Sequence, residues 1–165
     1  MIDKEKLPLE EYDMKVRQFF SHWDEVRDGL EKTLISLETN DLDVRPSNDA
    51  MTIGDILRHI AGAEVHWIQK VIMANWETNA RFSREDYPSK KDILALLKLT
   101  HLPTIKLLDE MSIDDLERVH TNQGGERFTV FWILWHTLEH EIHHKGQIFR
   151  DLRILGHPAR DIYGP

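Results

Sequence analysis

The segment His136-Thr-Leu-Glu-His140-Glu-Ile-His143-His144-Lys-Gly-Gln147 carries the most informative pattern in the chain. In an α-helix, residues four positions apart lie almost directly above one another. His136, His140 and His144 therefore share one face of the expected helix. The pair His140 and His144 can hold a metal ion from one side, but a zinc-type site needs at least three protein ligands. The pattern thus predicts a third ligand elsewhere in the chain.

His59 is the best candidate for that third ligand. It lies in a predicted helix over residues 52–74, on a stripe with Ile56 and Ala63, so its side chain is expected to point inward. Three neutral imidazoles suit Zn²⁺, Ni²⁺, Fe²⁺ or Cu²⁺ and do not suit Mg²⁺ or Ca²⁺. Three protein ligands also leave coordination positions open, which is the pattern of catalytic metal sites.

Four helical segments account for most of the chain. Apolar residues recur at helical spacing over residues 9–37, 52–74, 89–108 and 129–156. Strands do not alternate with these segments, so the sequence predicts an all-α fold, a four-helix bundle. The chain of 165 residues is expected to form one domain, residues 1–165, large enough to bury a sizeable core.

The ends of these segments carry recognisable signals. Thr52 and Ser89 are each followed three residues later by an aspartate, which is typical of a helix N-cap. Gly156 is expected to end the last helix. Pro103 is expected to kink or split the third helix, because proline removes an internal hydrogen bond. Residues 121–127 predict a turn.

Composition narrows the classes of partner. The net charge of −8 argues against a nucleic-acid partner, because phosphate binding needs a clustered basic surface. The chain has no cysteine, which excludes a disulfide and a thiol nucleophile. Residues 128–135 form the longest apolar run, whereas a membrane span needs roughly 20 residues, and the charged N-terminus does not resemble a signal peptide. We expect a soluble, cytoplasmic protein without a membrane partner.

The last helix has apolar residues on two sides. Phe131, Leu134, Leu138 and Ile142 fall on one side, while the other side combines the histidines with Ile133 and Ile148. A helix that is apolar on both sides is usually buried on both sides. We therefore expect one side to face the bundle core and a metal cleft, and the other to form the interface of a homodimer.

A second motif overlaps the histidines. The residues His140-Glu-Ile-His-His144 match H-E-x-x-H, the zinc metalloprotease helix, in which the glutamate is the general base. Glu141 would take that role here. A short helical bundle lacks the strand that such proteases use to align a peptide, so the motif favours a hydrolase in general over a protease. A di-iron carboxylate site is disfavoured, because it needs two Glu-x-x-His motifs and only Glu141-x-x-His144 fits.

Three segments resemble the DinB/YfiT-like superfamily, namely Thr52-Ile-Gly-Asp-Ile-Leu-Arg-His59, Trp135-His-Thr-Leu-Glu-His140-Glu-Ile-His-His144-Lys-Gly-Gln-Ile148 and Leu152-Arg-Ile-Leu-Gly156. The resemblance covers nearly the whole chain. It implies a four-helix bundle with up-down-down-up order that is often dimeric. It also implies one divalent metal, held by His59, His140 and His144, with His136 and His143 outside the set of ligands.

The resemblance further implies a metal-dependent transferase that uses a low-molecular-weight thiol, such as bacillithiol or mycothiol, on small electrophiles. Zinc or nickel is the expected metal, with iron as another option. Gln147, one turn past His144, is expected to support a ligand histidine, and Glu141 and His136 are candidates for proton transfer. The family's usual arginine is Lys145 here, which keeps the positive charge without the forked geometry.

Two other functions stay open at this point. The first is a metal-dependent hydrolase that uses metal-bound water with Glu141 as base. The second is a non-catalytic, stress-related binding module with a vestigial site. The transferase and hydrolase hypotheses imply a small-molecule substrate. The binding-module hypothesis implies no stoichiometric metal.

Overall fold

The computed structural model describes residues 15–157. Its helices are α1 (Val16–Phe19), α2 (His22–Ser36), α3 (Ile53–Glu64), α4 (Lys90–Glu110) and α5 (Val130–Ile154). A π-helical segment, Val65–Ile72, continues α3, and two short strands, β1 (Val119–Thr121) and β2 (Arg127–Thr129), precede α5. Short 3₁₀ turns span Thr39–Asp43 and Ile113–Glu117.

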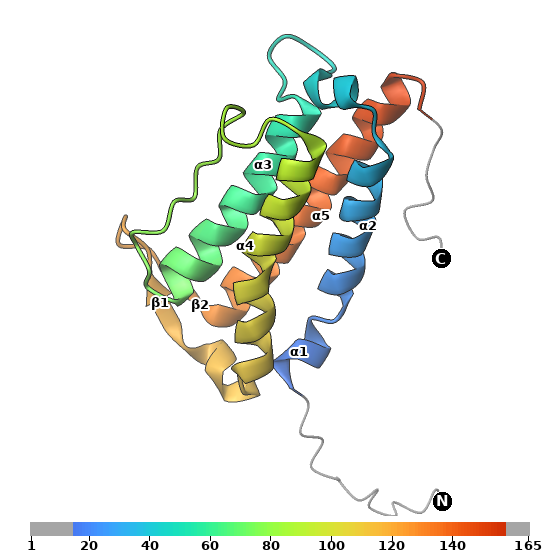
Figure 1. The fold of residues 1–165 in the computed structure, drawn as a ribbon. Coiled ribbons are helices and arrows are strands. Elements are labelled where there is room, and N and C mark those ends of the chain that lie inside the picture. The colour runs from blue at the N-terminus through green and yellow to red at the C-terminus, as the bar shows by residue number, and fades with distance from the viewer. Residues whose placement is uncertain (1–14, 158–165) are drawn as a thin grey trace, which may run out of the picture.

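The long helices of the described residues run side by side as a bundle (Figure 1). Along the chain, α2 runs up, α3 and α4 run down, and α5 runs up again. The helix α3 packs against α4 and α5, and α2 packs against the same two helices, so α2 and α3 occupy opposite corners. The predicted all-α fold with up-down-down-up order is confirmed.

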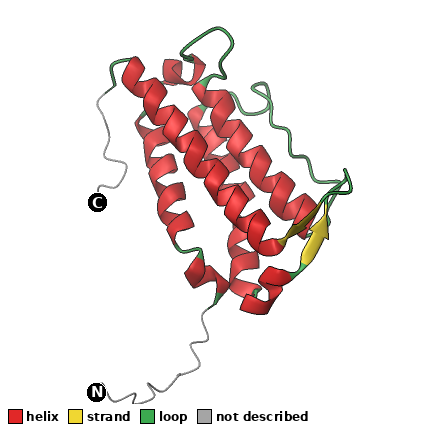
Figure 2. Ribbon diagram, turned by 180° about the vertical axis from the view of Figure 1, so that it is seen from behind, coloured by secondary structure: helices red, strands yellow, loops and turns green. Residues whose placement is uncertain are grey.

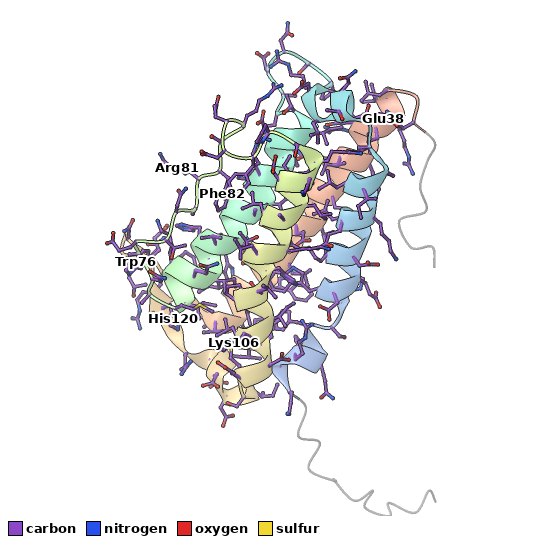
Figure 3. All side chains as sticks on the ribbon, viewed as in Figure 1. Glu38, Trp76, Arg81, Phe82, Lys106 and His120 are labelled. Atoms are coloured by element: carbon purple, nitrogen blue, oxygen red, sulfur yellow. The ribbon has the colours of Figure 1, made fainter. Side chains whose placement is uncertain are left out.

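A crossover loop over residues 73–89 makes it possible for α3 and α4 to run in the same direction. It returns along the outside of α3, where Trp76, Arg81 and Phe82 lie (Figure 3). A Cβ atom at Gly62 would collide with the carbonyl oxygen of Ala80. The absence of a side chain at Gly62 therefore lets this loop approach α3 closely.

The prediction of one continuous helix over residues 9–37 is wrong. Residues 9–14 lie outside the described part of the chain, and the remainder is broken at Phe20, whose backbone leaves helical geometry, into α1 and α2. The break turns α1 toward the lower end of α4. Val16 and Phe20 are both buried there, so α1 adds apolar burial at this end of the bundle.

Pro103 does not split α4, which is continuous from Lys90 to Glu110. The proline cannot donate a hydrogen bond to the carbonyl of Leu99, one turn earlier. Leu99 is 64% exposed, so water can reach this part of the helix. The interruption is therefore tolerated on the solvent side.

The turn predicted at residues 121–127 is the tip of a β-hairpin, and the sequence did not predict its strands (Figure 2). The strands β1 and β2 are antiparallel, with His120 paired to Phe128. Gly125 has φ +84° in the turn, a backbone region that glycine adopts without strain. The strand β1, which carries His120, contacts the π-helical segment, so the hairpin lies against it.

The predicted helix ends are confirmed. Thr52, Ser89 and Thr129 cap α3, α4 and α5 by accepting a hydrogen bond from a backbone N–H three residues ahead. The helix α5 ends in a Schellman motif, in which Gly156, at φ +83°, and the following residue donate to carbonyls of the last turn.

The apolar core has two parts, which we call the upper and lower core after the ends of the bundle in Figure 1. The upper core combines the C-terminal halves of α2 and α5 with the N-terminal halves of α3 and α4; its largest fully buried side chains are Leu30, Leu34, Ile53, Leu57, Ile60, Ile93, Leu96 and Leu97. The lower core lies around Phe20, Trp23, Ile68, Leu108, Ile133 and Leu134. Buried charged residues occupy the level between the two cores.

Part of the last helix stays exposed. Phe131, Trp135 and Ile142 are 42–52% exposed on α5, while Ile133, Leu134 and Ile148 are buried. The homodimer interface expected on this helix therefore stays a prediction. No helix within residues 15–157 is both long enough and apolar enough to cross a membrane.

Candidate metal centre

The structure brings the three predicted ligand histidines together. His59 comes from α3, and His140 and His144 come from successive turns of α5, which packs against α3. The Nε2 atom of His140 lies 3.1 Å from Nε2 of His59 and 3.1 Å from Nε2 of His144. One nitrogen from each ring lies within 4.8 Å of the others. Three imidazole nitrogens thus point at one position.

The surroundings keep these imidazoles neutral. Burial lowers the pKa of His59, and burial together with the neighbouring histidines lowers the pKa of His140 to about 3. The pKa of His144 is also lowered, chiefly by burial. A neutral imidazole has a free lone pair, which is the form that binds a metal ion. The set therefore fits a borderline transition metal such as zinc, nickel or iron.

Gln147 fixes the orientation of one predicted ligand. Its side-chain oxygen lies 2.6 Å from Nδ1 of His144. Because an amide oxygen only accepts, Nδ1 must carry the proton, and Nε2 keeps its lone pair toward the other two rings. The supporting contact expected from the one-turn spacing is present in the structure.

Glu141 does not join the histidines. Its side chain is 2% exposed and points into the bundle. There, Oε2 accepts hydrogen bonds from the Trp23 Nε1–H at 2.8 Å and from Arg27 Nη2 at 2.7 Å. The match to H-E-x-x-H is therefore not accompanied by the geometry of that motif, in which the glutamate faces the metal-bound water.

Glu141 belongs to a buried group that we call the charge layer, formed by Arg27, Glu64, His101 and Glu141. The Arg27 guanidinium also donates to Glu64 at 2.7 Å. Glu64 accepts further hydrogen bonds from Nδ1 of His101 and from the hydroxyl of Thr104, both at 2.6 Å. All four long helices contribute one member, and every member is at most 5% exposed.

The two carboxylates of the charge layer differ electrostatically. Burial opposes ionisation of Glu64, but Arg27 and the hydrogen bonds from His101 and Thr104 outweigh it and lower its pKa to about 2. Burial raises the pKa of Glu141, and Arg27 only partly offsets this. One oxygen of Glu141 is left without a hydrogen-bond partner. Burial would lower the pKa of Arg27, but the two glutamates raise it.

The other candidate residues fall into three environments. His136 lies one turn before His140, with ring centroids 6.3 Å apart, and is half-buried among aromatic rings. His143 is exposed. Lys145 is buried in the bundle and donates to the backbone oxygen of Val26 at 3.3 Å, so it faces away from the histidines. A Cβ atom at Gly29 would collide with its ammonium group, so the glycine makes room for it.

Sequence reasoning missed three members of the charge layer. No motif in the sequence contains Arg27, Glu64 or His101, so the sequence did not predict them. A signal was present, because each is preceded by a buried apolar residue four positions earlier, namely Trp23, Ile60 and Leu97. A charged or polar residue in register with an apolar stripe marks a buried polar contact when every helix has one.

Known proteins similar to this chain agree with the fold. The model of the DinB family matches residues 1–165. The uncharacterised protein YjoA of Bacillus subtilis (strain 168) is 27% identical over 151 residues, which is 90% of this chain and 93% of that protein.

Two solved structures are also similar. A DinB-like protein from Bacillus cereus ATCC 10987 superposes with a TM-score of 0.74 at 21% identity, over 92% of this chain and 99% of the other. The YjoA structure, also described as DinB-like, gives a TM-score of 0.71 at 21% identity, over 88% and 96%. At this identity the structures support the fold alone.

Proposed function

We propose that this chain, which belongs to the DinB family, uses its three histidines to hold one divalent transition metal and acts as a thiol-dependent transferase. The observation that supports the proposal is the convergence of one Nε2 atom each from His59, His140 and His144. Zinc or nickel fits this donor set best, and iron also fits. Three protein ligands leave positions open for a substrate atom.

The substrates we propose are a low-molecular-weight thiol and a small electrophile. When bound, the metal ion supplies a Lewis acid that favours the thiolate form of a coordinated thiol. The chain has no cysteine, so the thiol must come from outside the protein. His136 is the residue we propose as acceptor of the thiol proton, since its ring lies one helical turn from His140.

The position of Glu141 favours transfer over hydrolysis. A hydrolase of the H-E-x-x-H type needs its glutamate beside the metal-bound water. Here the carboxylate is buried and bonded to Trp23 and Arg27. Glu141→Gln is therefore expected to leave the metal content and the transfer rate nearly unchanged, whereas a hydrolase using this base would lose its turnover.

The proposal is tested first by the metal content of untagged protein, measured by inductively coupled plasma mass spectrometry. Wild type is expected to hold about one ion per chain, and His59→Ala and His140→Ala are expected to lose it. The matched control is His143→Ala, because His143 is an exposed histidine on the same helix and outside the cluster. Equal metal content in wild type and His140→Ala would refute the site.

The second step measures the reaction itself. Metal-loaded wild type is incubated with a thiol and an electrophile, and the loss of free thiol is followed. Transfer that requires the ion and disappears in His59→Ala supports the transferase. Full metal binding without any thiol consumption would contradict the transferase and leave only the metal site.

A further inference from the structure

An aromatic cluster adjoins the three-histidine site, and we call it the aromatic corner; it is formed by Trp67, Phe128, Trp132 and His136. Three of its rings form a stacked column. The ring centroids of Phe128 and Trp132 are 4.4 Å apart, with an angle of 23° between the ring planes. Those of Trp132 and His136 are 4.6 Å apart, with an angle of 11°. The Trp67 ring is nearly perpendicular to these three rings, and its centroid lies 5.2–5.4 Å from each of theirs.

Three separate elements build the aromatic corner. Trp132 and His136 are one turn apart on α5, Phe128 comes from β2, and Trp67 comes from the π-helical segment. The hairpin that carries Phe128 contacts the same π-helical segment through β1. π-helical turns are rare and recur at functional sites. The fold thus fixes the relative positions of rings from distant parts of the chain.

The column leads directly to the predicted metal ligands. Trp132, His136, His140 and His144 follow one another at four-residue spacing on α5, so they lie along one face. Phe128 of β2 stacks on Trp132 at the start of this row. The His136 ring is 6.3 Å from that of His140. A molecule with one atom at the three histidines therefore has the aromatic corner beside it.

The aromatic corner is not closed off from solvent. Trp132 is 40% exposed, and Trp67, Phe128 and His136 are half-buried. Trp23, by contrast, is fully buried and is hydrogen-bonded to Glu141. Large apolar rings that stay accessible beside a polar site are the usual lining of a small-molecule site. Such rings prefer to pack against another planar ring, stacked or edge-on.

We propose that the aromatic corner binds an aryl group of the molecule that the three-histidine site takes. The site would then select aryl-bearing substrates over aliphatic ones with the same reactive atom. This inference rests on the proposed function, because it needs an ion at the histidines. It adds Trp67 and Trp132 as residues that determine specificity.

The test compares two nitrogen donors that bind metal ions directly, 4-phenylimidazole and imidazole. Zinc-loaded protein is titrated with each by calorimetry, after the zinc content has been measured. Wild type is expected to bind 4-phenylimidazole at least about tenfold more tightly, the ratio expected for one good aromatic contact plus the area it buries. Trp132→Ala is expected to lose most of this preference while retaining zinc and the affinity for imidazole.

Two further variants separate specificity from folding. Trp135→Ala is the matched control, because Trp135 is an exposed tryptophan on α5 that stacks on Phe131 and is not part of the aromatic corner. It is expected to keep the full preference. Trp132→Phe is expected to restore most of it. If Trp132→Ala does not fold, Trp67→Ala takes its place, because Trp67 is the other tryptophan of the aromatic corner and its loss is likewise expected to remove most of the preference.

The possible outcomes separate a failure of the aromatic inference from a failure of the proposed function. Zinc at one ion per chain with equal affinity for both probes overturns the aromatic inference alone. An unchanged preference in Trp132→Ala does the same, and would show that the rings only stabilise the hairpin. Wild type that holds no zinc overturns the inference together with the proposed function.

Discussion

The charge layer and the three-histidine site share two consecutive residues of α5, yet they are chemically opposite. Glu141 points into the bundle and meets the positive charge of Arg27, so the charge layer contains both signs. His140 meets only other imidazoles. Each group in the charge layer has a protein partner, whereas the histidines present the same kind of donor atom to one common position.

This difference separates polar groups that are paired with one another within the chain from a group of histidines that could hold an added ion. Buried charges persist in proteins when they are paired and hydrogen-bonded. Convergent neutral nitrogens on a half-exposed surface gain nothing from one another, and an added cation is the partner that satisfies all three. Changes to the charge layer should therefore alter folding, and changes to the histidines should alter binding.

The largest effect on folding is expected from Arg27→Ala. It leaves Glu64 and Glu141 buried without their cation, which should lower the free energy of unfolding by about 3–5 kcal/mol. Urea denaturation measures this. The matched control is Lys32→Ala on the same helix, where an exposed pair with Asp28 should contribute at most about 0.5 kcal/mol. A loss in Arg27→Ala no larger than in Lys32→Ala would remove the distinction between the two regions.

Metal addition should have the next largest effect, and it should act only through the histidines. Zinc at about 100 times its dissociation constant should raise the free energy of unfolding of metal-free wild type by about 2.7 kcal/mol. His59→Ala should show no such gain, although its stability without metal should match wild type. Equal stabilisation of both proteins by zinc would mean that the ion binds elsewhere.

Glu141→Gln should lower the free energy of unfolding by about 1–3 kcal/mol, because it weakens buried hydrogen bonds with Arg27 and Trp23. Its zinc content should equal that of wild type, even though the neighbouring residue is a predicted ligand. Glu139→Gln, at an exposed position of the same helix, serves as the control and should have almost no effect. Loss of zinc in Glu141→Gln alone would link the two regions.

The smallest effect concerns pH, because the histidines are only partly shielded from solvent. The pKa of His140 falls from 6.5 to about 3 on folding, so between these values the unfolded chain binds more protons. The contribution of His140 to the free energy of unfolding of the metal-free protein is therefore fully present above pH 6.5 and is lost as the pH falls toward 3. His59 and His144 act in the same direction.

Unfolding measured between pH 7 and pH 5 tests this, because Glu64 loses its contribution only below about pH 4.5, as the pH falls toward 2. His140→Ala should flatten the slope in the upper window, and Glu64→Gln should leave that slope unchanged. The raised pKa of Glu141 opposes the loss equally in wild type and His140→Ala, so it cancels in that comparison. A slope unaffected by His140→Ala would contradict the lowered pKa.

The sequence predicted the helical segments and the three converging histidines because both follow from local spacing. Four-residue periodicity on α5 places His140 and His144 together whatever the rest of the fold does. His59 was expected to join them from an inward stripe of its own helix, but its side chain is exposed and meets them at the surface, where α3 packs against α5. Caps at Thr52 and Ser89 were also predictable, since their partners lie three residues away.

The features that were not predicted depend on contacts between distant residues. Glu141 was read as a base because its neighbours match a motif, but Arg27, 114 residues away, determines where it points. The break at Phe20 depends on how the lower core is filled. The π-helical turns and the paired strands of the hairpin likewise have no distinctive spacing in the sequence.

The π-helical segment Val65–Ile72 has a consequence for how the length of this chain can change in evolution. A π-helix and an α-helix differ by about one residue per turn, so a one-residue deletion there can be absorbed by a change of helix type before the crossover loop. The helix α5 is α-helical throughout, so it cannot absorb a change of length in this way. One residue inserted between His140 and His144 would rotate the second histidine by about 100° and separate the pair. Related sequences should therefore vary in length near Val65–Ile72 and keep the spacing in α5 fixed.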